Sequence, residues 1–167
     1  GQVTVVASYT PDSDGVWRIA NQAHRQYLQA LMDTWPREYA TQVARFVVFD
    51  ESLVPFDAFV ETPQYRANAW VYGVGDELVT EPYSAAGQEV MTHELAHLFA
   101  HESNGDDTYL EQFIEQFWSP SQLVESARVM SATDVELAAY RYYLTRPDDF
   151  VSDYAAQNPE EDFAESY

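Results

Sequence analysis

Residues 84–101 read SAAGQEVMTHELAHLFAH, and this stretch decides the fold. The leading serine can cap a helix, and no proline interrupts the segment before the Asn-Gly pair at 104–105, so it predicts one helix that ends before that pair. On such a helix His93 and His97 lie one turn apart on the same face, and Glu94 follows the first histidine. The segment therefore places two imidazoles and a carboxylate side by side.

This arrangement predicts a metal centre. Imidazoles four residues apart on a helix can converge on one tetrahedral zinc ion. The intervening glutamate can take the proton of a water that the metal activates. We therefore expect one Zn²⁺ with His93 and His97 as ligands, and Glu94 as the general base of amide hydrolysis.

A third protein ligand is needed, and the nearby candidates fail. His101 continues the spacing, but the eight residues from His93 to His101 correspond to a rise of about 12 Å along a helix, too far for both to bind one ion. The extended HExxHxxGxxH pattern also fails, because Ala100 and Ser103 stand where it requires glycine and histidine. Since the chain has no cysteine, the third ligand has to be a carboxylate from elsewhere.

Two regions offer that carboxylate. Near the C-terminus, residues 154–165 read YAAQNPEEDFAE, where Asn158 can cap a helix that begins with proline and carries glutamates on its opening turns. Glu161 and Glu165 share a face of that helix. A rival ligand is Glu136, on a predicted helix nearer in sequence to the histidines.

Two short blocks resemble a known family. HELAH together with the distal pattern Tyr-x6-Glu-x2-Phe-Ala-Glu resembles the gluzincin branch of the zincin metallopeptidases, especially the catalytic domain of anthrax lethal factor and the Pro-Pro endopeptidases. The resemblance covers roughly residues 90–101 and 152–167 and does not extend to the N-terminal half. It implies a zinc endopeptidase, with a peptide or protein as the substrate.

The resemblance also assigns residues. It implies that Glu161 is the third zinc ligand, and that the hydroxyl of Tyr154 helps to polarise the substrate carbonyl or to stabilise the oxyanion. It gives Glu165 the role of accepting a hydrogen bond from a ligand histidine. The 63 residues between His97 and Glu161 exceed the spacing of the smallest members, so residues 103–150 are expected to form inserted helices.

The remaining segments predict an α+β fold, mainly helical, zincin-like and with a small mixed sheet, as a single domain over residues 1–167. Apolar periodicity predicts a helix from Trp17 to Trp35, on which His24 is expected to be a surface or cap-type histidine outside the metal site. Residues rich in β-branched and aromatic side chains predict strands at 2–9, 45–49 and 68–73. Within the last of these, Trp70 to Gly73 is the predicted edge strand beside which the peptide lies.

Charge limits the partners. The chain carries 28 acidic residues against 8 basic ones, all arginine, for a net charge of −20. Such a surface repels nucleic-acid phosphates and anionic membranes, and the chain has no apolar run long enough to enter a bilayer. The opening residues lack the features of a signal peptide. We expect a monomer in a secreted or extracytoplasmic location, and the competing interpretation is a zinc-binding domain without catalysis that recognises a protein partner.

Overall fold

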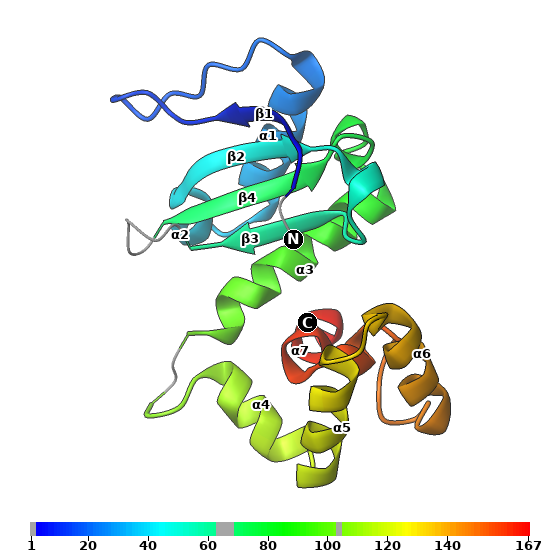
Figure 1. The fold of residues 1–167 in the computed structure, drawn as a ribbon. Helices are drawn as coiled ribbons and strands as arrows, with labels where there is room; N and C mark the ends of the chain where they lie inside the picture. Colours follow the sequence, from blue (N-terminus) through cyan, green and yellow to red (C-terminus); the bar gives the residue numbers. More distant parts are fainter. Residues whose placement is uncertain (1–2, 63–68, 103–104) are drawn as a thin grey trace. The chain divides into compact units, whose positions relative to one another are not determined.

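The structure, a computed structural model, describes residues 3–62, 69–102 and 105–167. The predicted strand positions Gln2 and Asn68, and the predicted helix stop at Asn104, lie outside these residues. The chain divides into two compact units, Gly1–Glu94 and Leu95–Tyr167, and the boundary falls inside one helix (Figure 1). The expectation of a single domain stays a prediction.

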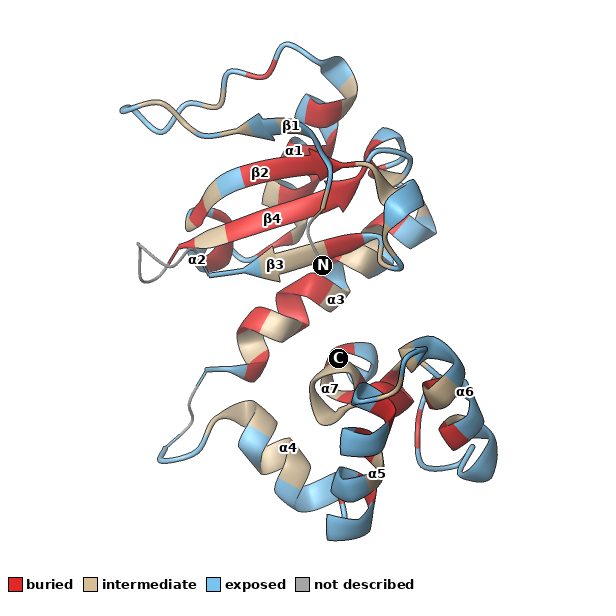
Figure 2. Ribbon diagram, viewed as in Figure 1, coloured by how far each residue is buried: buried red, intermediate tan, exposed pale blue. Residues whose placement is uncertain are grey.

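The first unit is built on a four-stranded mixed sheet in the order β1-β2-β4-β3 (Figure 1). Strand β2 pairs antiparallel with β1 and parallel with β4, and β4 pairs antiparallel with β3. Figure 2 shows that the two inner strands are buried along most of their length. The elements of this unit in chain order are β1 (Val5–Tyr9), α1 (Gln22–Thr34), α2 (Arg37–Ala40), β2 (Val43–Phe49), η1 (Glu51–Leu53), β3 (Ala58–Glu61), β4 (Trp70–Gly75), η2 (Leu78–Thr80) and the first part of α3 (Ala85–Ala100).

Two of the predicted strands, those at 45–49 and 68–73, are hydrogen-bonded neighbours in the sheet, but the prediction that the second one lies at an edge is wrong. Strand β4 lies between β2 and β3, so its backbone groups are already paired on both sides. The strand at the edge is β3. It is only four residues long and lies in a stretch with prolines and aromatics, so the sequence there shows no clear strand periodicity.

Helix α1 supplies the aromatic core of the first unit. Tyr27 stacks on Phe46 with ring centroids 6.1 Å apart, and the Trp35 ring meets Tyr72 edge-on at 5.5 Å. The helix begins later than predicted, at Gln22, because the side chain of Asn21 accepts a hydrogen bond from the His24 backbone and caps it there.

Of the two expectations for His24, the surface position is wrong, whereas its backbone N–H does take part in the cap that begins α1. The residue is buried, and its Nδ1 lies 2.8 Å from the hydroxyl of Tyr9 on strand β1. Burial lowers the pKa of its imidazole, because the charged form loses water there. His24 therefore joins α1 to the sheet.

The first part of α3 is fixed to this core. The Trp35 Nε1 group donates a hydrogen bond of 2.8 Å to the carbonyl of Met91, which lies two residues before His93. Thr34 Oγ1 donates to the Gln88 side chain, and Ser84 Oγ accepts from the backbone of Gly87 as the predicted cap. A Cβ on Gly87 would lie 2.6 Å from the backbone oxygen of residue 81, so only glycine lets the helix start this close to the preceding loop.

The second unit is helical, which confirms the predicted helices between the two motif blocks. After the end of α3, it contains α4 (Tyr109–Phe117), α5 (Pro120–Met130), α6 (Val135–Thr145), η3 (Ala155–Gln157) and α7 (Pro159–Ser166). Each of the helices α4, α5 and α6 opens on a side-chain cap, from Thr108, Ser119 and Asp134. Among the described residues, none of the helices is long and apolar enough to cross a membrane.

A small core holds this unit and positions α7. Its members are buried side chains from α5, α6, η3 and the loops, namely Trp118, Val129, Ala139, Tyr142, Phe150, Ala155 and Ala156. Trp118 Nε1 donates 2.9 Å to the buried carboxylate of Asp162 on α7, and Ser126 Oγ donates 3.0 Å to the backbone oxygen of Gln157 just before it. These two bonds fix the start of α7, the helix that carries the predicted third ligand.

Candidate metal centre

Helix α3 brings together the two predicted histidine ligands and the predicted general base. One potential ligand atom from each of His93, Glu94 and His97 lies within 4.8 Å of the other two. Glu94 is buried, whereas both histidines are half-buried. The i, i+4 spacing on a regular helix accounts for this cluster, because residues four apart stack on one face.

Glu94 lies near two buried tyrosines of the first unit. The hydroxyls of Tyr27 and Tyr72 are 3.0 Å apart, and both residues are fully buried. Burial is the main cause that raises the pKa of each phenol, and the negative charge of Glu94 raises both further. The negative charge of Glu94 therefore acts on both buried phenols. Sequence analysis missed both tyrosines, because Tyr27 fitted a core stripe and Tyr72 a strand.

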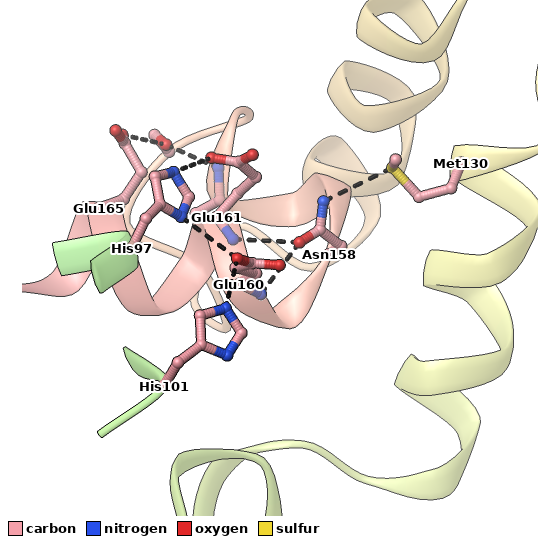
Figure 3. Close-up of polar contacts among 9 residues, drawn as sticks. His97, His101, Met130, Asn158, Glu160, Glu161 and Glu165 are labelled. Atoms are coloured by element: carbon pink, nitrogen blue, oxygen red, sulfur yellow. Dashed lines mark hydrogen bonds and ion pairs between the residues drawn. The ribbon is translucent and has the colours of Figure 1, made fainter. Parts of the chain in front are cut away.

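His97 also faces the glutamate that the family resemblance implies. Its Nε2 lies 3.4 Å from Oε2 of Glu161 on α7 (Figure 3). Two ligand atoms bound at about 2.0–2.1 Å to one tetrahedral zinc are roughly 3.3 Å apart. The spacing between these two atoms thus fits a pair of ligands on the same ion. Asn158 presents Glu161 by accepting hydrogen bonds from the backbone of both residues 160 and 161, the predicted cap.

A second carboxylate faces the other ring nitrogen of His97. Glu160 Oε1 lies 3.7 Å from His97 Nδ1 and 3.1 Å from His101 Nε2 (Figure 3). The contact with His97 is the main cause that lowers the pKa of Glu160; partial burial opposes it, and the contact with His101 adds to it. Adjacent glutamates therefore stand at the two nitrogens of one imidazole.

Sequence analysis missed this role of Glu160 and His101. His101 was rejected as a metal ligand, and that exclusion says nothing about a contact with a carboxylate. The sequence did contain a signal for this contact. His97 and His101 share a helix face, and the C-terminal helix carries two adjacent glutamates that could face them.

The other predicted residues lie in the second unit. Tyr154 is half-buried and immediately precedes η3. The carboxylate of Glu165 accepts 2.8 Å from Ser152 Oγ. The rival ligand Glu136 is exposed on the first turn of α6, whereas His97 contacts the glutamates of α7. The roles given to Tyr154 and Glu165 stay predictions.

The donor set suits zinc. Two imidazole nitrogens and one carboxylate oxygen are the ligands of one class of catalytic zinc site, which keeps a fourth position for water or substrate. Comparison of the chain with family models, curated proteins and solved structures finds no match. The assignment of a function therefore depends on the residues themselves.

Proposed function

We propose that this protein is a zinc-dependent endopeptidase of the gluzincin type, with His93, His97 and Glu161 holding the metal and Glu94 acting as the general base. The observation that carries the proposal is the 3.4 Å spacing of His97 Nε2 and Glu161 Oε2, beside the cluster on α3. Residues 64 positions apart in sequence are brought to the separation that a shared ion requires.

In the proposed mechanism, the metal, Glu94 and Tyr154 have different roles. Zinc, when bound, polarises the scissile carbonyl and makes water more acidic. Glu94 takes a proton from the attacking water on its carboxylate and returns it to the leaving amine. Its position beside buried tyrosines strengthens its electrostatic interactions by excluding water. The hydroxyl of Tyr154 donates a hydrogen bond to the developing oxyanion.

Glu160 orients a ligand. Oε1 of Glu160 lies 3.7 Å from Nδ1 of His97, an ion-pair distance, so its negative charge favours a proton on Nδ1 and leaves the lone pair on Nε2, the nitrogen that faces Glu161. Glu160 is itself held by His101. The peptide substrate lies extended and adds its backbone to an open sheet edge; with β4 internal, the edge beside it is β3.

The test compares wild type with Glu94→Gln, and uses Glu89→Gln on the exposed side of the same helix as the control. Bound zinc is measured by mass spectrometry of the native protein, and hydrolysis with a peptide library. We expect one zinc in all three proteins and a loss of at least about 100-fold in cleavage only for Glu94→Gln.

The possible outcomes separate the candidate functions. Stoichiometric zinc without cleavage by wild type would indicate a binding domain rather than a peptidase. Full cleavage by Glu94→Gln, or zinc that survives His97→Ala unchanged, would refute the assignment of these residues.

A further inference from the structure

Helices α5 and α6 of the second unit form a pocket that the proposed peptidase mechanism does not use. Its volume is about 540 Å³, within the range of small-molecule sites. Three of the chain's eight arginines gather here, although the protein as a whole carries a net charge of −20. The lining residues are Glu125, Arg128, Val129, Ala138, Arg141, Tyr142, Thr145 and Arg146.

The arginines are not equally neutralised. Arg128 forms an ion pair with Glu125 on its own helix, and Arg146 pairs with Asp149 at 2.9 Å. Within the described part of the chain, Arg141 has neither a hydrogen bond nor an ion pair. The pocket therefore retains a guanidinium whose five donors are available to a ligand.

Tyr142 provides a second, independent observation. Its residue is 9% exposed, and its buried hydroxyl has no hydrogen-bond partner among the described residues. Burial raises the pKa of the phenol; the charge of Arg146 opposes that rise, and the charge of Glu125 adds to it. Tyr142 itself lines the pocket. Buried hydroxyls almost always have a partner, so this one indicates a missing acceptor.

We propose that the pocket binds a small organic anion through a carboxylate or phosphate group held by Arg141 and the Tyr142 hydroxyl. The planar guanidinium matches both oxyanions, and the phenol donates to either. Val129, Ala138 and the tyrosine ring offer apolar surface for a compact carbon body. The strong negative charge of the chain repels polyanions far more than a single small anion, which favours a metabolite-sized ligand over nucleic acid.

The experiment measures binding by titration calorimetry at constant ionic strength in chloride, with inorganic phosphate and benzoate as separate probes. Four zinc-depleted proteins are compared: wild type, Arg141→Gln, Tyr142→Phe and the control Arg37→Gln on the exposed surface of α2. Removing a charged partner should weaken binding at least about tenfold in Arg141→Gln. Tyr142→Phe should weaken it several-fold, and Arg37→Gln should bind like wild type.

Both pocket variants should fold, because Arg141 is exposed and Tyr142→Phe keeps the aromatic ring; circular dichroism checks this. A change in binding can therefore be assigned to the pocket. Saturable binding of either probe with the expected losses supports the site, and the tighter probe identifies the head group. Absence of saturable binding to wild type, or wild-type affinity in either pocket variant, overturns it. None of these outcomes depends on zinc or peptide cleavage.

Discussion

Glu161→Gln is predicted to remove most of the affinity for zinc. Substitutions of residues that only orient a metal ligand cost about 10- to 100-fold in affinity. Loss of a ligand should exceed that range, so we expect a loss of more than about 100-fold, or about 2.8 kcal/mol. The side chain of Glu161 is only 19% exposed and its oxygen is 3.4 Å from His97 Nε2, so water cannot readily substitute for it.

The matched control is Glu160→Gln, which removes the same charge from the adjacent residue of the same helix. Glu160 faces Nδ1 of His97 at 3.7 Å, and its side chain is 44% exposed. We therefore expect an effect near the lower end of the orienting range, about tenfold. Because both variants lose one negative charge at nearly the same place, the difference between them isolates direct ligation from the general attraction of the cation.

The assay is competition for zinc against a chromophoric chelator at fixed pH and ionic strength, with circular dichroism to show that α7 remains folded. Equal losses in the two variants would refute the reasoning, because they would mean that Glu161 acts only through its charge. Wild-type affinity in Glu161→Gln would exclude it as a ligand and leave Glu136 as the rival.

Two further predictions concern stability. Trp118→Phe removes the donor to Asp162, a carboxylate that is 5% exposed, and should lower the free energy of unfolding by about 1–3 kcal/mol in urea denaturation; an unchanged midpoint would contradict this. Burial lowers the pKa of His24 in the folded protein below the usual 6.5. As the pH falls, the imidazole is therefore protonated in the unfolded chain before it is protonated in the folded protein, and the free energy of unfolding decreases from about pH 7 downward. His24→Gln should show a weaker fall in unfolding free energy between pH 7.5 and 5 than wild type, and identical pH profiles would exclude this contribution.

Local signals predicted the helices well. Caps at Asn158 and Ser84 fix where α7 and α3 begin, and each acts through neighbours in sequence. The sheet was harder, because the position of a strand within it depends on residues far away. Strand β3 contains only four residues, and its presence moves β4 from the edge to the interior.

The candidate metal site also has a part that local sequence predicted and a part that depends on distant residues. His93, Glu94 and His97 share one helix, so their spacing alone predicted that they would lie together. The partners of His97 come from a helix more than 60 residues later, and no local pattern states which carboxylate turns toward which nitrogen. The family resemblance pointed to Glu161 but not to Glu160, because a residue that orients a ligand has no fixed place in a motif.

The position of α7 explains how one helix can serve both nitrogens of His97. Successive residues on a helix point about 100° apart, so Glu160 and Glu161 can stand on either side of a single imidazole. Both lie in the first turn, where the helix dipole favours negative charge and where Asn158 satisfies their backbone groups. The placement therefore depends on the start of the helix being fixed, which Trp118 and Ser126 accomplish from the core of the same unit. Shifting that start by one residue would rotate Glu161 away from Nε2, so the proposed metal site depends on the capping residue and the core contacts as well as on the proposed ligands.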